Sequence, residues 1–453
     1  MHHAGSTGAD GAANRAKGAA HWAKGAKHWA KRATTPGRLR NATNHAHHRD
    51  NVIYLDNNAT TAIDPQVADA VADVHRRGPM NASSQHAAGR AAAALLADAI
   101  ESIGHHLGSR IGTPGGPRIV ITSGGTEANH LGLAGWADGV AGRADGVAER
   151  AGGVTGTDRQ NRRDLCVSAV EHPCVMETAA FLQRQRGVRV HVAPVDGDGV
   201  VDVAAMDAML DEYPIGAVAV MSANNETGVI QPIHRVAERC RQRGVWLHVD
   251  ATQTIGKLPF EPETLGVDSA VLSAHKFHGP TGVGALYLGP GRSIAPTFHG
   301  GGQQLETRPG TEPVAAVVGM ATALDVAMRS QTETAGHCRR QRDRLESAIR
   351  EAAPSVVIQG GDAPRLPGTT CLSLVGADRQ SFLMALDMAS IAASSGSACS
   401  SGSAPPSHVL IAMGRPETEI QSAIRFGVSK FTTDDEIETA VKRILKVYAR
   451  LKK

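Results

Sequence analysis

Three short stretches of the chain carry the side chains most capable of chemistry. The stretch TSGGTEANHLGLAG, residues 122–135, has a Gly-rich turn at the start of a helical pattern, where backbone N–H groups and the Thr126 hydroxyl make a phosphate site. The stretch HVDATQ, 248–253, ends a strand-like run with Asp250, and Gln253 follows three residues later. In SAHKFHGPTGVGALYL, 273–288, Lys276 stands between a strand and a Gly/Pro turn.

Two of these stretches have a structural explanation when each is taken alone. A Gly-rich turn before a helix is often only a turn, and an aspartate such as Asp250 can cap the next helix. Lys276, between Ser273 and His275 at a strand end, is poorly placed for a solvated surface role, whereas a lysine that forms a Schiff base needs a desolvated site. The three stretches together predict a pyridoxal phosphate site. The Gly-rich turn would bind the phosphate, the carboxylate would pair with the ring nitrogen, and the lysine amine would react with the aldehyde.

A fourth stretch carries a single thiol. In SSGSACSSGS, residues 394–403, Cys399 is surrounded by Ser and Gly, which have little to bury and leave the backbone free. A cysteine on such a tether can reach a buried group and then a second protein in turn, and it reacts as the thiolate. We therefore interpret this stretch as a carrier arm.

Composition limits the class of protein. The chain has 453 residues, 42% hydrophobic and 20% charged, which is typical of a soluble globular protein of about two domains. Aromatic residues are only 3% and the net charge is +3, so we expect no direct nucleic-acid binding. There is no run of about 18 apolar residues, so no membrane span is expected. The six cysteines form no CxxC pair, which argues against a structural metal site and favours a reducing compartment.

The patterning of the remaining chain predicts an α/β fold. Short apolar runs alternate with amphipathic segments, which favours a mostly parallel sheet covered by helices. Residues 233–244 predict a helix closed by Gly244, residues 315–350 a long helical segment, and residues 417–450 two helices around a short strand. The expected strands are 118–123, 217–223, 246–251 and 269–275.

Two segments depart from this pattern. Residues 1–50 are basic, rich in His and Ala, and hold only two acidic residues, Asp10 and Asp50, which predicts a disordered arm. An organellar transit peptide is the alternative, but we favour an arm on a cytoplasmic protein. Residues 137–163 repeat ADGVA and are Gly-rich, which predicts a surface insertion.

The motifs, in this order, resemble those of cysteine desulfurases of the NifS/IscS type, in the fold type I, class V aminotransferase superfamily. The chain departs from the family at Ala82, where proline is frequent, and at His278, where an aromatic residue is frequent. The resemblance runs from about residue 53 to 448 and rests on YLDNNATT (54–61), NASSQH (81–86), TSGGTEAN (122–129), EHPCV (171–175), NNETGV (224–229), HVDATQTIGKLP (248–259), SAHKFHGP (273–280), RPGTEP (308–313), SSGSACSSGS (394–403) and AIRFGVS (423–429).

The resemblance implies the fold and its division. We expect a large domain with a mostly parallel mixed sheet covered by helices, and a smaller C-terminal α/β domain. The implied boundaries are an arm at 1–50, a segment at 51–65 that joins the small domain, a large cofactor-binding domain at 66–312 with the insertion 137–163, and a small domain at 313–453 with the cysteine loop at 394–405.

The resemblance also implies residue roles. Lys276 would hold pyridoxal 5'-phosphate as a Schiff base, His172 would stack on its ring and assist proton transfer, and Cys399 would accept the sulfur. Thr311 would reach the cofactor phosphate of the neighbouring subunit, which implies a homodimer. The remaining implied contacts are Gly125, Thr126, Ser273 and His275 with the phosphate, Asp250 with the ring nitrogen, Gln253 with the ring hydroxyl, Asn225 with cofactor and substrate, and Arg425 and Asn58 with the substrate.

The activity implied is removal of sulfur from L-cysteine, which gives L-alanine and a persulfide on Cys399. Acceptor proteins, such as an iron–sulfur scaffold or a tRNA-thiolation protein, would then take the sulfur. No resident metal is implied, although a transient iron–sulfur contact through Cys399 is compatible with this chemistry. The alternatives are a selenocysteine lyase, a related class V lyase, and an inactive scaffold of iron–sulfur assembly; the presence of both Lys276 and Asp250 argues against the last.

Overall fold

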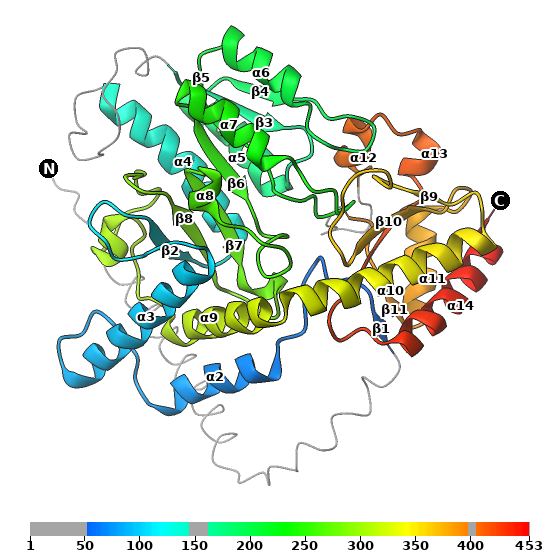
Figure 1. Ribbon diagram of the computed structural model, residues 1–453, viewed down its shortest axis with the longest axis horizontal. Coiled ribbons are helices and arrows are strands. Elements are labelled where there is room, and N and C mark those ends of the chain that lie inside the picture. The colour runs from blue at the N-terminus through cyan, green and yellow to red at the C-terminus, as the bar shows by residue number, and fades with distance from the viewer. Residues whose placement is uncertain (1–51, 145–161, 397–404, 453) are drawn as a thin grey trace, which may run out of the picture. The chain divides into compact units, whose positions relative to one another are not determined.

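A seven-stranded mixed sheet carries the first part of the fold (Figure 1). The computed structural model describes residues 52–144, 162–396 and 405–452, and the described residues from Ile53 onward form one unit. The strand order is β2-β8-β7-β6-β5-β3-β4, and the neighbours are parallel except for β8, which is antiparallel to both β2 and β7. The strands are β2 (Arg118–Thr122), β3 (Asp164–Ser168), β4 (Val190–Ala193), β5 (Ile215–Ala219), β6 (Trp246–Asp250), β7 (Ser269–Ser273) and β8 (Gly284–Leu288).

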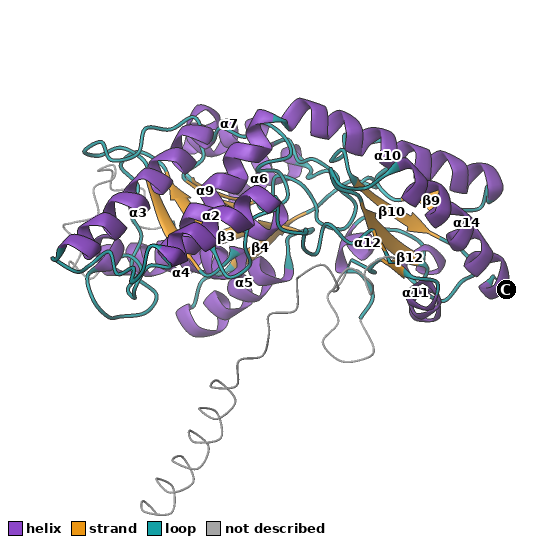
Figure 2. Cartoon of the chain, turned by 90° about the horizontal axis from the view of Figure 1, so that it is seen from below, coloured by secondary structure: helices purple, strands orange, loops and turns teal. Residues whose placement is uncertain are grey.

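Helices cover both faces of this sheet, because its strands are apolar on both sides (Figure 2). In β2, Ile119 and Ile121 pack into the first core cluster, whereas Val120 packs on the opposite face against α4 (Gly125–Ala144). The first core cluster takes side chains from α2 (Pro65–Arg76), α3 (Ala87–His106), α6 (Val203–Glu212), α7 (Ile233–Arg243) and α9 (Val314–Arg329), and the other face is covered by α4 (Gly125–Ala144) and α5 (Pro173–Arg186).

A second core cluster forms around a smaller antiparallel sheet of order β12-β10-β9. Beside it, β1 (Ile53–Tyr54) pairs in parallel with β11 (Ile391–Ala392), so the start of the described chain lies with its C-terminal part. The elements here are α10 (Gln331–Ala352), β9 (Val357–Ile358), β10 (Thr369–Ser373), α11 (Arg379–Met388), β12 (Ala423–Gly427) and α14 (Asp434–Leu451). The short helices elsewhere are α8 (Pro262–Leu265), η3 (Ala274–Lys276), η4 (Gln303–Glu306), α12 (His408–Ala412) and α13 (Glu417–Ile420).

The expected α/β class is confirmed, and all four expected strands form. Helix α7 ends at Gly244, which is left-handed with φ 63°. The long helical segment at 315–350 is present as two helices that meet at Ser330. The division into two domains stays a prediction. Helix α9 packs in the first core cluster, whereas α10 packs in the second, which also contains Ile53 and Leu55.

The predicted start of the surface insertion, residue 137, is wrong, because the helix before it continues through residue 144. Residues 137–144 continue α4, and Ala137 is buried against β3 and β5 in the core cluster on that face. Residues 145–161, the arm before residue 52, and residues 397–404 with Cys399 lie outside the described residues. Among the helices that the structure describes, none is both long and apolar enough to cross a bilayer.

Candidate active site

A cavity of about 580 Å³ lies at the carboxyl ends of β6 and β7, the edge at which parallel sheets bind ligands. Residues from the elements around the second core cluster also line it, among them Leu383 of α11 and Arg425 of β12. Eleven of the predicted site residues line this one cavity: Asn58, Gly125, Thr126, His172, Asn225, Asp250, Gln253, Ser273, His275, Lys276 and Arg425. Thr311 is exposed and is absent from the lining, and Cys399 lies outside the described residues.

One end of the cavity has the features of an anion site. Helix α4 begins at Gly125, and a Cβ built there would lie 3.2 Å from the Thr252 hydroxyl oxygen. The hydroxyls of Thr252 and Ser273 are buried and have no hydrogen-bond partner within the described part of the chain. Buried hydroxyls need a partner, so this helix N-terminus with two free hydroxyls fits a phosphate group.

Asp250, the last residue of β6, presents a buried carboxylate to the cavity. Its Oδ1 accepts from the backbone N–H of Thr252 at 2.9 Å, and its Oδ2 accepts from Nδ2 of Asn129 at 2.8 Å. Asn129 was not among the predicted site residues. Its signal was available, since it lies three residues after Thr126 on α4 and therefore on the same helix face.

Lys276 ends the short helix η3, directly after β7. Its Nζ donates to the backbone carbonyls of Asn58 at 2.6 Å and Ala59 at 2.8 Å. Burial lowers the pKa of Lys276 to about 8, and the positive charge of Arg425 acts in the same direction. A lysine that must attack an aldehyde needs this loss of charge, because only the neutral amine is a nucleophile.

His172 is the N-cap of α5, which fixes the orientation of its ring. Its Nδ1 accepts from the backbone N–H of Cys174 at 3.2 Å and lies 3.0 Å from Cys174 Sγ. Burial lowers the pKa of His172. Because a backbone N–H can only donate, the neutral ring carries its proton on Nε2. Cys174 lines the cavity but its thiol pKa is raised to about 12 by burial, so it is present as the thiol.

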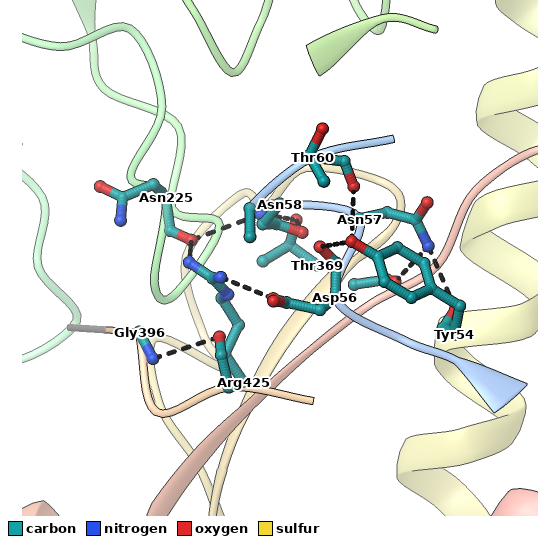
Figure 3. Close-up of polar contacts among 12 residues, drawn as sticks. Tyr54, Asp56, Asn57, Asn58, Thr60, Asn225, Thr369, Gly396 and Arg425 are labelled. Carbon is teal, nitrogen blue, oxygen red and sulfur yellow. Dashed lines mark hydrogen bonds and ion pairs between the residues drawn. The ribbon is translucent and has the colours of Figure 1, made fainter. Parts of the chain in front are cut away.

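Arg425 projects from β12 toward the chain segment around Asp56 (Figure 3). It is buried, and its guanidinium donates to Asp56 Oδ1 at 2.7 Å and to the backbone carbonyl of Asn225 at 3.0 Å. Asn58, in the same view, donates to Thr369 Oγ1 at 2.9 Å. Asp56 was missed at the sequence level, although it lies within YLDNNATT, because nothing local ties it to an arginine 369 positions away.

Two further predicted residues have fixed partners. Gln253 donates from Nε2 to the backbone carbonyl of Asn58 at 3.0 Å and accepts from Lys257 Nζ at 2.8 Å. His275 Nδ1 lies 3.1 Å from Thr60 Oγ1, and burial, with the charge of Lys276, lowers its pKa to about 4. His275 is therefore neutral near pH 7.

Comparison with known proteins relates this geometry to one family. The family model described as aminotransferase class-V matches residues 53–439. A protein of Sinorhizobium fredii (strain NBRC 101917 / NGR234) named cysteine desulfurase is 37% identical over 88% of this chain and 97% of its own length. The X-ray structure of a NifS-like protein from Rickettsia africae ESF-5 is 30% identical with a TM-score of 0.76, over 88% of this chain and 99% of that one. A structure titled "SspA in complex with cysteine" is 27% identical with a TM-score of 0.65, over 84% and 99%.

Proposed function

The chain belongs to the cysteine desulfurases of the aminotransferase class-V family, and from this premise we propose which residues carry its reaction. The overall change removes the sulfur of L-cysteine and leaves L-alanine. The observation that carries the assignment of residues is the meeting of Lys276, Asp250 and the anion site of Gly125 in one cavity. The names of the relatives favour neither a selenocysteine lyase nor an inactive scaffold.

The residues of this cavity fit pyridoxal phosphate. The free hydroxyls of Thr252 and Ser273 suit a phosphate, and the Asp250 carboxylate suits a protonated ring nitrogen. Lys276 would hold the cofactor, with Gly125, Thr126, Ser273 and His275 at its phosphate, Gln253 at its ring hydroxyl and His172 and Asn225 at its ring. When bound, the cofactor supplies an electron sink for the bond broken at the substrate Cα.

The remaining steps belong to the chain itself. The guanidinium of Arg425, with Asn225 and Asn58 beside it, orients the carboxylate of the substrate. The neutral amine of Lys276 takes the Cα proton, because burial has lowered its pKa. The proton on Nε2 of His172 is available for transfer within the cavity.

We propose that Cys399 accepts the sulfur of the substrate. Its thiolate attacks the sulfur of the substrate, so that an S–S bond forms as the Cβ–S bond breaks, and the electron pair left on Cβ takes up a proton to give the methyl group of alanine. The enzyme then holds a persulfide and alanine leaves. Acceptor proteins, such as an iron–sulfur scaffold or a tRNA-thiolation protein, would take the sulfur in the cytoplasm. We also propose a homodimer in which the exposed Thr311 reaches the cofactor phosphate in the neighbouring subunit.

Alanine release tests this assignment. Protein loaded with pyridoxal phosphate should absorb near ~420 nm, as a protonated imine does, and should form alanine from L-cysteine. Lys276→Ala should lose both the absorbance and the activity. Cys399→Ala should keep the absorbance and lose alanine formation on the order of 100-fold. Cys240→Ala, in which the altered thiol is buried in α7 outside the cavity, is the matched control.

Two results would contradict the assignment. Alanine formation at the wild-type rate in Cys399→Ala would remove the persulfide step. A wild-type protein that stays colourless with added pyridoxal phosphate would refute the assignment of this cofactor and, with it, the proposed enzymatic reaction.

A further inference from the structure

A fully buried histidine lies behind Asp250 on the same strand. His248 and Asp250 are two residues apart in β6, so their side chains project from the same face of the sheet. His248 Nε2 lies 2.9 Å from Asn129 Oδ1, and its Nδ1 lies 2.8 Å from Ser269 Oγ. Asn129 is the residue whose amide donates to Asp250. His248 thus reaches the carboxylate through one intervening side chain.

The donors and acceptors of this chain of contacts can be assigned without ambiguity. The carboxylate of Asp250 accepts, so Asn129 must turn its Nδ2 toward it, and a second N–H of the same amide reaches Cys174 Sγ at 3.3 Å. The Oδ1 of Asn129 is then left to accept from His248, which must carry its proton on Nε2. A reversed amide would bring oxygen against oxygen at Asp250.

The other end of the chain of contacts fixes the same tautomer. With the proton of His248 on Nε2, its Nδ1 accepts, and the hydroxyl of Ser269 donates to it. Ser269 Oγ in turn accepts from the indole N–H of Trp246 at 2.9 Å. Every hydrogen bond therefore points in one direction, from Trp246 through Ser269, His248 and Asn129 to Asp250.

Packing keeps His248 in this place and this state. A Cβ added at Gly132 of α4 would lie 2.6 Å from Cε1 of His248, so the helix backbone packs closely against the imidazole ring. Burial lowers the pKa of His248 to about 4, against the opposing influence of Asp250, and the ring is neutral near pH 7. A neutral ring with one fixed proton can give direction to the amide of Asn129, whereas a charged ring would donate from both nitrogens.

We propose that His248, held by Ser269 and Trp246, is a positioning residue that fixes Asn129 and through it the aim of the Asp250 carboxylate at the cofactor ring nitrogen. This inference rests on the proposed function, since it needs a pyridine nitrogen opposite Asp250. The competing explanation is a histidine that only satisfies buried polar groups. The two differ in whether the protonation of the ring nitrogen depends on residue 248.

The test is ¹⁵N NMR of the holoenzyme loaded with pyridoxal phosphate labelled at the ring nitrogen, titrated with pH. His248→Phe and Asn129→Ala should each lower the proton affinity of the ring nitrogen about tenfold or more, because the Asp250 carboxylate is no longer held in its orientation toward that nitrogen. His248→Gln, whose amide can donate to Asn129 and accept from Ser269, should stay near the wild type. Ser269→Ala should shift the affinity in the same direction by a smaller factor.

Controls separate this proposal from general damage. His191→Phe removes a histidine bonded to Asp164 at the sheet edge, outside the cavity, and should leave the ring nitrogen unchanged. Asp250→Asn should abolish protonation of the cofactor ring nitrogen, and it therefore gives the largest decrease in proton affinity that the other variants can approach. If His248→Phe does not fold, Asn129→Ala and Ser269→Ala carry the test.

The outcomes are distinguishable. Unchanged ring-nitrogen affinity in Asn129→Ala and Ser269→Ala, with full cofactor occupancy, would overturn the positioning role while the proposed function stands. A wild-type protein that binds no labelled cofactor would instead remove the proposed function itself.

Discussion

At the scale of single residues, burial lowers the pKa values of the basic groups in the cavity. It lowers the pKa of Lys276 to about 8 and that of His275 to about 4, and Arg425 supports the first shift through its fixed positive charge. Arg425 is itself paired with Asp56. Arg425 and Asp56 thus form an ion pair beside the cavity, while His275 is neutral near pH 7 and a larger fraction of Lys276 is neutral than for an exposed lysine.

The lowered pKa of Lys276 predicts the pH dependence of cofactor attachment. The neutral amine reacts with the aldehyde, so the rate of imine formation by the apoprotein should rise with pH through a midpoint near 8, rather than near the ordinary lysine value of about 10.4. At pH 7 this makes the neutral fraction on the order of 100-fold larger than for an exposed lysine. Stopped-flow absorbance between pH 6 and pH 10 measures the rate. A rate still climbing steeply above pH 9 would contradict the prediction.

The sequence indicated residues that line the cavity and whose types suit a direct role, but not the residues that hold them in place. Thr126, Asp250 and Lys276 each stand in a local motif whose residue types indicate a role. Asp56 was missed because its role arises from a contact with Arg425, 369 positions away. The spacing of Asn129 from Thr126 indicated a helix face but not its partner Asp250, 121 positions later. Such partners are specified by tertiary packing, which local patterns do not contain.

At the scale of elements, the strands were easier to predict than their surroundings. Strands β6 and β7 are short apolar runs that end in polar residues, so both their position and the edge at which Asp250 and Ser273 lie could be inferred. The extension of α4 through residues 137–144 could not be inferred, because Gly and Asp in ADGVA are weak helix formers. Burial of Trp136 and Ala137 explains why the helix continues in spite of them.

The segment that leads to Cys399 begins at a glycine with a demanding conformation. Gly396 has φ +83°, and a Cβ there would lie 2.7 Å from Oε2 of the buried Glu226. Gly396→Ala should therefore destabilise the protein by about 1–2 kcal/mol and slow alanine formation in a single turnover, while cofactor binding is retained. Urea unfolding and rapid-quench measurement of alanine check the two effects.

A matched substitution controls for the added methyl group. Gly336 lies inside α10 with an ordinary helical φ, and only the end of the Arg340 side chain lies within 4 Å of a Cβ built there. Gly336→Ala should raise the free energy of unfolding by about 0.5–1 kcal/mol, because alanine is the better helix former. Equal effects of the two substitutions would mean that the positive φ and Glu226 impose no constraint at residue 396.

At the scale of the whole molecule, the site depends on both core clusters. Asp250 and Lys276 come from the edge of the seven-stranded sheet, whereas Arg425 comes from the three-stranded sheet. The segment 56–59 connects the two clusters, since Asp56 pairs with Arg425 and the backbone carbonyls of Asn58 and Ala59 accept hydrogen bonds from Lys276. Substitutions that weaken the contacts between the two clusters should therefore reduce the affinity for the substrate more than the affinity for the cofactor.

The buried histidines make the stability of the whole protein depend on pH. Burial lowers the pKa values of His248, His275 and His278 to about 4 in the folded protein, against an ordinary value near 6.5. Between these values the unfolded chain binds protons that the folded protein does not. The free energy of unfolding that these groups contribute is thus complete above pH 6.5 and is lost as the pH falls toward 4.

Replacing one of these histidines isolates its share. His248→Gln removes the proton uptake at the fully buried ring but leaves His275 and His278 in place. Between pH 7 and pH 5 the wild type should therefore lose on the order of 2 kcal/mol more unfolding free energy than His248→Gln, from about 1.5 pKa units at 1.36 kcal/mol each. Urea unfolding followed by circular dichroism at the two pH values gives this difference. Equal losses in the two proteins would mean that residue 248 takes up its proton without unfolding, and a protonated ring there could not donate from Nε2 alone.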